Sequence, residues 1–334
     1  MALMHFQVKS VSRSNGSNAV ARAAYISREK LRDELIRQTF DFRARGGLDH
    51  AEILVPSDAS TWTRAWAADR ANVWNTAEAH ETRVNSRVAQ EYVVALPHEL
   101  TGPARLTLAR DFAQSLADRY HVVADLAVHQ PPPDNDPRNH HAHILTTTRE
   151  VTATGLGPKA TFAYNDDRRR FYELPSNAEE IRLLRHEWAD RVNAQLREAN
   201  LSITVDARSY WEQGIAKAPR RHLSSAVMRL ERAGIATDAR ARALREQAEL
   251  QGHMTAHAEK QAREAERGIA AAAAQGPPPG GGPPPVARPL TLEERDARAL
   301  ERWLAYREAL AAGREPEKGR ELVRARDLGA EFEI

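Results

Sequence analysis

Two strand-like segments lie close together near the middle of the chain. VVADLAVH (122–129) and HAHILTTTRE (141–150) are rich in aliphatic and β-branched residues, and the proline-rich loop QPPPDNDPRNH joins them. This loop is too short for the crossover helix that parallel neighbours need, so the two strands must run antiparallel. The pair therefore predicts an antiparallel sheet.

The rest of the first two hundred residues reads as a mixture of strands and helices. Alternation of apolar and polar residues predicts strands, and a 3.6-residue period predicts helices. The expected strands cover residues 3–12, a hairpin of 36–42 with 48–56, and 90–97; the expected helices cover 17–34, 60–84, 100–120 and 177–200. Ser17 and Thr101 are candidate N-caps. The class that follows is α+β, with helices and an antiparallel sheet.

A helical extension follows this mixed region. Residues 216–275 are rich in alanine, arginine and glutamate and lack strand signals. GPPPGGGPPPVARP (276–289) cannot bury apolar surface and is expected to be a linker. Thr291 and Glu294 are spaced to form a capping box for a last helix. The expected division is a domain at 1–215, a helical extension at 216–275, the linker at 276–289, and a C-terminal helical segment at 290–334.

The composition narrows the chemistry. The 334 residues hold 48 basic and 46 acidic side chains, so the net charge of +2 requires any basic surface to be local. Cysteine is absent, which excludes disulfides, thiolate metal sites and cysteine nucleophiles. No apolar run approaches the roughly 20 residues that span a bilayer, and the start MALMHFQVKSVSRS is too polar for a signal peptide. We expect a cytoplasmic protein without membrane insertion.

Three histidines lie at the facing ends of the two central strands. Alternation along a strand puts His141 and His143 on one face, about 7 Å apart at Cα. If the two strands form a hairpin, His129 lies opposite the start of the second strand, and three imidazoles converge. Three nitrogen ligands with open coordination positions are typical of a catalytic metal site. The plainer alternative is a group of surface histidines beside a polar loop.

The residues leave the identity of the ion open, because imidazole binds several divalent metals. A phosphate substrate would complete the coordination shell of Mg²⁺ or Mn²⁺. His140 has the opposite strand parity and is left out of the ligand set. In strand 122–129, the face with Leu126 and Val128 suits packing against helices, whereas the face with Asp125 and His129 is smaller and more polar. We expect helices on the first face and a ligand groove on the second.

A tyrosine in the expected helix 17–34 lies away from the centre of the apolar stripe. At helical spacing Tyr25 shares a face with Arg22, Glu29 and Arg32. Its phenol is available to attack a substrate, and arginine neighbours favour a phosphate nearby. Arg13 and the turn SNGSN at the helix entry add a cation and backbone N–H groups for phosphate oxygens. The alternative is a tyrosine that only covers a hydrophobic edge.

Four separated blocks carry a family resemblance. SVSRSNGSNAVARAAYISREKLRDE, FDFRARGGLDHAEILVP, EYVVALP and NHHAHILTTTR together resemble the MobA/MobL (MOBQ) family of plasmid mobilisation relaxases, within the HUH endonucleases. The resemblance covers residues 1–215 in order, and HLSSAVMRLERAGIAT is similar to the segment after the relaxase core. It implies the HUH relaxase fold, a five-stranded antiparallel sheet with helices, here followed by a helical C-terminal extension.

The resemblance also implies an activity. Tyr25 would be the nucleophile, and His129, His141 and His143 would hold the metal. Such enzymes nick one strand at an origin of transfer, stay joined to its 5′ phosphate through the tyrosine, and later rejoin it. The implied partners are single-stranded origin DNA, accessory relaxosome proteins and a coupling protein, in the bacterial cytoplasm and in transfer with the DNA. Replication and transposition relatives place the histidine pair before the tyrosine, so the order here favours mobilisation.

An assisting carboxylate is expected beside the histidines, where it would orient one of them. Glu91, at the start of EYVVALP, is the first choice, and Glu78 and Glu81 are weaker candidates. An ordinary strand-end glutamate is the alternative for Glu91. NHHAH departs from the NPHAH-like pattern of the family, so the role of His140 stays open. His5 and His50 lie on expected strands, where a structural role is the simpler assignment.

A basic and aromatic stretch is the candidate DNA track. AYNDDRRRFYELP (163–175) offers Arg168, Arg169 and Arg170 next to tyrosine and phenylalanine, and such interleaving suits single-stranded DNA. A solvated turn with its aromatics in the core is the alternative. Two other functions stay open on the residues: a metal-dependent phosphoesterase that uses water, and a non-catalytic DNA-binding component of a transfer complex.

Overall fold

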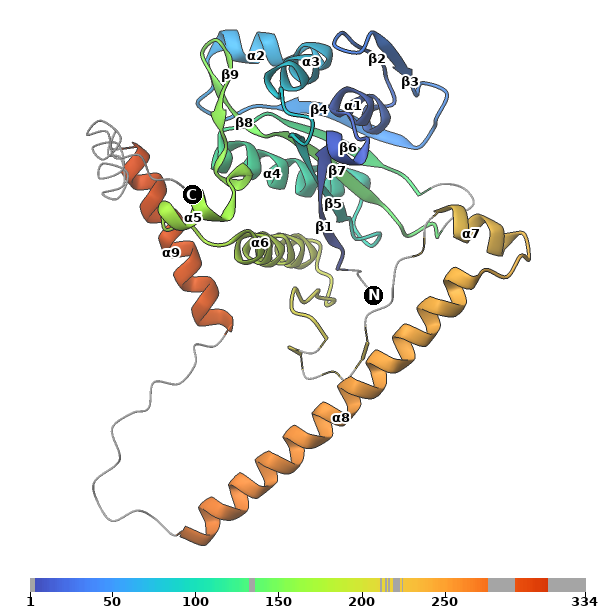
Figure 1. Ribbon diagram of the computed structural model, residues 1–334, viewed down its shortest axis with the longest axis vertical. Coiled ribbons are helices and arrows are strands. Elements are labelled where there is room, and N and C mark those ends of the chain that lie inside the picture. Colours follow the sequence, from blue (N-terminus) through green and yellow to red (C-terminus); the bar gives the residue numbers. More distant parts are fainter. Residues whose placement is uncertain are drawn as a thin grey trace. The chain divides into compact units, whose positions relative to one another are not determined.

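The computed structural model describes residues 4–131, 136–210, 225–275 and 292–311, with a few positions between 212 and 223 (Figure 1). Contacts divide the chain into two units, residues 1–207 with 290–334, and residues 208–289. Within the segment 290–334 that the sequence analysis set apart, the described helix at 292–311 belongs to the first unit. The linker 276–289 and Thr291 lie outside the described residues.

A five-stranded antiparallel sheet is the centre of the first unit. Its strand order is β1-β5-β7-β6-β4. The strands are β1 (Phe6–Ser12), β5 (Arg87–Ala95), β7 (His141–Thr147), β6 (Ala124–His129) and β4 (Leu48–Leu54). The expected α+β class with a five-stranded antiparallel sheet is confirmed. Strands β6 and β7 pair directly, with His129 opposite His141.

One face of the sheet packs against two long helices. These are α4 (Gly102–Tyr120) and α6 (Asn177–Glu198), close to the expected ranges, and Thr101 caps α4 as predicted. Leu126 and Ile144 project to this side and pack with Phe112 and Trp188 in a large core. Alternating residues of β6 and β7 therefore enter this core, as the apolar parity of 122–129 predicts.

Helices also cover the opposite face. They are α1 (Ala19–Ser27), α2 (Thr61–Ala67) and α3 (Arg70–His80), which lie across the sheet from α4 and α6 (Figure 1). Val20 and Trp74 pack with Ala127 and Leu145 in a second core. The prediction of helices on one face only is wrong, because the small side chains of this face leave room for close helix packing. The histidines lie at the end of this face.

The expected helix 17–34 is only half correct. Helix α1 begins after the N-cap Asn18, not Ser17, and ends at Ser27; its C-cap Arg28 has a left-handed backbone with a φ of 58°. The following residues form a hairpin of β2 (Lys30–Asp33) with β3 (Gln38–Asp41). Leu31 is buried in the second core, and Asp33 accepts hydrogen bonds from the turn N–H groups of Leu35 and Ile36. Tertiary packing thus overrides the local helix propensity.

The expected hairpin of 36–42 with 48–56 is also wrong. Strand β4 pairs with β6 instead, so that a segment distant in sequence forms the edge of the main sheet. A second small hairpin joins β8 (Arg149–Thr152) to β9 (Gly155–Lys159). Two 3-10 helices (Arg13–Asn15 and Thr161–Ala163) and the short α5 (Asp166–Phe171) complete this part.

The expected last helix is present as α9 (Leu292–Ala311) and packs on α6 within the first unit. The Arg119 guanidinium lies 5.1 Å from the Trp303 ring, and Arg302 lies 3.5 Å from Glu179. The second unit holds α7 (Ser225–Arg232) and α8 (Asp238–Gln275), which Arg240 and Glu231 link by an ion pair of 2.7 Å. Among the described helices, none has the length and apolar character needed to cross a bilayer.

Candidate active site

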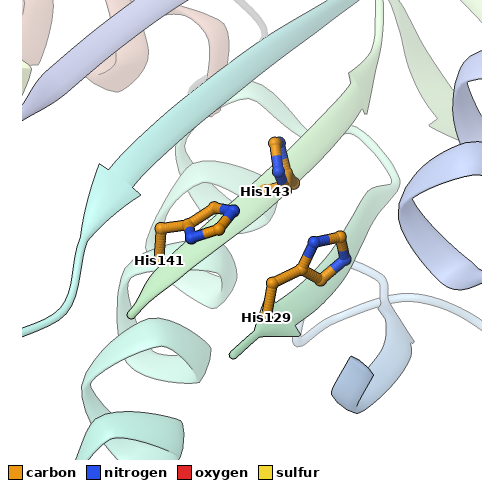
Figure 2. Close-up of side chains that lie close together, drawn as sticks. All are labelled: His129, His141 and His143. Atoms are coloured by element: carbon orange, nitrogen blue, oxygen red, sulfur yellow. The ribbon is translucent and has the colours of Figure 1, made fainter. Parts of the chain in front are cut away.

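The three histidines predicted as ligands converge at one end of β6 and β7. One ligand nitrogen from each of His129, His141 and His143 lies within 4.8 Å of the others. The ring centroids are 4.8 to 5.4 Å apart, and Figure 2 shows the rings turned toward a common point. The hairpin register explains this, because His129 pairs with His141 and the side chain of His143 lies on the same face.

A hydrogen bond from one ring nitrogen orients each imidazole. His129 Nε2 donates to the Ile26 carbonyl oxygen at 2.7 Å, and His141 Nδ1 donates to the Asn139 carbonyl oxygen at 2.9 Å. His143 Nδ1 donates to Glu91 Oε1 at 2.7 Å. Because each acceptor fixes a proton on one nitrogen, the other nitrogen keeps its lone pair. Acceptors of this kind are typical of histidines that bind metals.

The surroundings keep these rings neutral. Burial lowers the pKa of His129 to about 3 and the pKa of His141 to about 4. Burial also lowers the pKa of His143, although the hydrogen bond to Glu91 opposes the change. A metal ligand must be the neutral imidazole, so all three rings are in the form that binds a cation at neutral pH. The donor set fits a divalent ion with three nitrogen ligands.

Glu91 connects this cluster to the helix that carries the tyrosine. Burial alone would raise its pKa, but the hydrogen bond from His143 and the charge of Arg22 lower the pKa to about 2. The carboxylate is buried and forms an ion pair with the Arg22 guanidinium. Glu78 and Glu81, the weaker candidates, lie elsewhere: Glu78 binds the start of α1, and Glu81 pairs with Arg149 and Lys159.

Tyr25 lies in the last turn of α1, on the same side of the sheet as the histidines. Its half-buried ring meets Phe42 edge-on at 5.4 Å between centroids. The guanidinium carbons of Arg28, Arg22 and Arg45 lie 4.6, 5.0 and 5.3 Å from the ring centroid. Three guanidinium groups therefore surround the Tyr25 ring. Two of them, from Arg22 and Arg28, also contact Glu91 and His129 at the histidine cluster.

Two of these arginines were missed by the sequence analysis. Arg28 follows Tyr25 by three residues, and this helical spacing is the signal that could have placed it beside the Tyr25 ring. Arg45 comes from the loop after β3, and nothing in the local pattern places it near α1. Glu29 and Arg32 were expected beside Tyr25 on one helix, but both lie beyond the end of α1; Glu29 pairs with Arg70 instead.

The other histidines considered from sequence lie outside the cluster of three that the described residues form. The backbone of His140 pairs with Leu96 through a 2.8 Å hydrogen bond. His50 Nε2 lies 3.0 Å from Glu52 on the same strand, and the His5 carbonyl accepts from the Ala95 N–H. The positions of His5 and His50 fit the structural roles expected for them.

The arginines expected to contact DNA differ in environment. Arg169 is 1% exposed, and its guanidinium binds Glu180 and the carbonyl oxygens of Pro175 and Thr161. A DNA contact for Arg169 is thus wrong, because burial and the ion pair remove its charge from the surface. The Arg168 guanidinium lies 4.0 Å from the Tyr164 ring, and Arg170 is exposed. Arg13 binds Glu78 across the entry to α1.

The chain is similar to curated proteins and to a solved structure. The conjugal transfer protein TraA of Agrobacterium fabrum is 33% identical over 238 residues, which cover 67% of this chain and 21% of that protein. The mobilization protein MobL of Acidithiobacillus ferridurans is 34% identical over 256 residues, 70% of this chain and 64% of that protein. A solved structure described as "Molecular Basis of Vancomycin Resistance Transfer in Staphylococcus aureus" has a TM-score of 0.52 and 30% identity. It covers 63% of this chain and 100% of that chain.

This chain spans about a fifth of the length of the TraA proteins that it matches. A family model matches more than half of the chain. The model of the MobA/MobL family covers residues 17–233, which include Tyr25, Glu91 and the three histidines. The chain belongs to the MobA/MobL family.

Proposed function

We propose that this protein nicks and rejoins one DNA strand at an origin of transfer through a covalent bond between Tyr25 and a 5′ phosphate. Family membership supports the proposal, because similar proteins carry the names conjugal transfer and mobilization protein. One observation supports it most directly. Arg22 and Arg28 each contact the Tyr25 ring, and they also contact Glu91 and His129, which supports a role for the phenol at the candidate ion site.

In the proposed reaction the phenol oxygen of Tyr25 attacks the scissile phosphorus. The new bond joins this oxygen to phosphorus, the bond from phosphorus to the 3′ oxygen breaks, and the 3′ oxygen takes up a proton to leave as a hydroxyl. The phenol proton passes to solvent, so charge and atoms balance. The ester keeps the energy of the broken bond, so a later 3′ hydroxyl can attack it and release Tyr25.

The residues around Tyr25 have separable roles in this reaction. The guanidinium groups of Arg22 and Arg28 stabilise negative charge on the phenol oxygen and the phosphate. Glu91 orients His143 by its hydrogen bond. A divalent ion, Mg²⁺ or Mn²⁺ by our expectation, would polarise the phosphate as a Lewis acid when bound. The proposed substrate is single-stranded origin DNA, with accessory relaxosome proteins and a coupling protein as partners in the bacterial cytoplasm.

Covalent capture of DNA tests this function. The full chain is incubated with end-labelled single strands that tile the origin region of its own replicon, with Mn²⁺ or Mg²⁺, and then denatured. We expect a labelled adduct that Tyr25→Phe abolishes while leaving DNA binding nearly unchanged. Tyr210→Phe is the matched control, because Tyr210 is 45% exposed and belongs to the second unit.

Two results would favour the other functions. Cleavage that persists in Tyr25→Phe would indicate a metal-dependent phosphoesterase that uses water as the nucleophile. DNA binding without cleavage, on every origin strand and with either ion, would indicate a non-catalytic component of a transfer complex. Either result would overturn the proposed role of Tyr25.

A further inference from the structure

Arg28 contacts the candidate nucleophile and one histidine at the same time. Its guanidinium carbon lies 4.6 Å from the centroid of the Tyr25 ring, and its Nη1 donates to the Tyr25 carbonyl oxygen. Its Nη2 lies 3.4 Å from Nδ1 of His129. One side chain thus spans the space between the phenol and the ligand cluster.

The hydrogen bonds of His129 determine which nitrogen Arg28 contacts. A carbonyl oxygen can only accept, so the 2.7 Å contact with Ile26 places the ring proton on Nε2. The neutral ring then keeps its lone pair on Nδ1, and Figure 2 shows this nitrogen directed toward the other two rings. A guanidinium has no acceptor, so Arg28 donates to that lone pair. The same lone pair is the one a metal ion needs.

We propose that Arg28 competes with the divalent ion for Nδ1 of His129 and, when the ion displaces it, binds the scissile phosphate beside Tyr25. This inference rests on the proposed function and assigns a coupling role to a residue outside the expected site. A single lone pair cannot serve both a guanidinium and a cation, and two positive charges close together repel. The displaced guanidinium remains on the residue three positions after Tyr25, where a phosphate diester attracts it.

The backbone of Arg28 offers a substitution that suits the fold. Its φ of 58° at the end of α1 lies in the left-handed region that glycine adopts without strain. Arg28→Gly therefore removes the guanidinium without opposing the helix end. Arg45→Gly is the matched control: the Arg45 guanidinium also lies over the Tyr25 ring, at 5.3 Å, but among the described contacts it reaches no histidine.

The first measurement uses no DNA. The full chain, freed of metal, is titrated with Mn²⁺, and the free ion is followed by its paramagnetic resonance signal. We expect Arg28→Gly to bind Mn²⁺ about fivefold more tightly than the parent, the effect of removing one competing hydrogen bond. Arg45→Gly should bind like the parent. An unchanged or weaker affinity in Arg28→Gly, or an equal gain in Arg45→Gly, would overturn the competition.

The second measurement follows adduct formation at saturating Mn²⁺. We expect Arg28→Gly to form the adduct between about tenfold and a hundredfold more slowly, because a charged hydrogen bond to the phosphate is lost. An unchanged rate would overturn the phosphate-binding role. Failure of the proposed function can be told apart from failure of this inference. A parent protein that forms no adduct contradicts the function, whereas the Mn²⁺ titration needs no DNA and still tests the competition. His141→Ala must weaken Mn²⁺ binding, since otherwise the ion is not held by the histidines and the inference fails.

Discussion

Glu78 Oε1 accepts a 2.6 Å hydrogen bond from the backbone N–H of Ala19, the first residue of the helix that carries Tyr25. Its Oε2 accepts from Arg13 Nε at 3.1 Å and from Nη2 at 2.8 Å. The carboxylate is buried. One side chain of α3 therefore satisfies a free N–H at the start of α1 and holds the turn that leads into it. Loss of this contact would release the first turn of the helix that carries Tyr25.

We expect Glu78→Ala to lower the free energy of unfolding by about 2–3 kcal/mol, because a buried N–H and a partly buried guanidinium lose their acceptor. Glu78→Gln should cost about half as much, since its amide oxygen still accepts from Ala19. Urea unfolding followed by tryptophan fluorescence measures both changes. Glu34→Ala is the control, because Glu34 is exposed. A Glu78→Ala protein that unfolds at the parent's urea midpoint would show that α1 does not depend on this contact.

Arg70, the first residue of α3, fixes the other end of α1. Its Nε and Nη2 donate to the buried Asp125 at 2.8 and 3.0 Å, and it also pairs with Glu29 just after α1. Trp74 Nε1 donates to the same Asp125 carboxylate at 2.9 Å. Arg70→Met should destabilise the fold by about 3 kcal/mol near neutral pH, because a fully buried carboxylate loses its cation.

The destabilisation by Arg70→Met should depend on pH. Burial raises the pKa of Asp125, and the charge and hydrogen bonds of Arg70 oppose this rise. Without Arg70 the pKa rises further. A carboxyl whose folded-state pKa is raised contributes stability at low pH that is lost as pH rises through that pKa, so the deficit of the variant should be larger at neutral pH than in mild acid. Unfolding free energies of both proteins at the two pH values test this; an equal deficit would contradict it.

The geometry of the ligand cluster follows from short-range rules. Strand alternation places His141 and His143 on one face, and the short loop requires an antiparallel pair that brings His129 opposite His141. Glu91 was a less certain choice, because a strand-end position does not reveal that the carboxylate meets His143 one strand away. The register of β5 with β7 supplies that contact, and register depends on the whole sheet.

Long-range packing explains what the sequence analysis missed. The segment after Ser27 has good helix formers, yet it forms a hairpin because Leu31 enters the core and Asp33 binds both the turn and Asn18. The helix-on-one-face expectation failed for a similar reason, since alanine-rich α1 can approach the sheet closely. Arg169 resembles its neighbours in sequence, and only the tertiary contact with Glu180 shows that its charge is internal.

The histidine cluster makes a sharp prediction about metal binding. His141→Ala and His143→Ala should each weaken Mn²⁺ binding at least about tenfold, as loss of a ligand or its support does. His140→Ala should bind like the parent, because His140 is not part of the cluster of three that the described residues form. Saturating Mn²⁺, at about a hundred times its dissociation constant, should stabilise the parent by about 2.7 kcal/mol. Thermal unfolding with the ion and with a chelator measures this stabilisation. Equal stabilisation of the His140→Ala and His141→Ala proteins would contradict the assignment of His141 as a metal ligand.

The three consecutive arginines of α5 should behave differently on DNA. Arg168 and Arg170 are near the surface, whereas Arg169 is buried against Glu180. If α5 lines the path of single-stranded DNA, replacing both Arg168 and Arg170 with glutamine should reduce the slope of log affinity against log salt by about 1.4, since each phosphate contact on a single strand contributes about 0.7. Arg169→Gln should leave that slope unchanged and instead lower stability by about 3 kcal/mol, because Glu180 loses its buried cation. Fluorescence anisotropy over a salt series measures the slopes. An unchanged slope in the double variant would show that α5 does not contact the DNA. A slope that changes only in Arg169→Gln would show that Arg169 leaves its buried position to bind the strand.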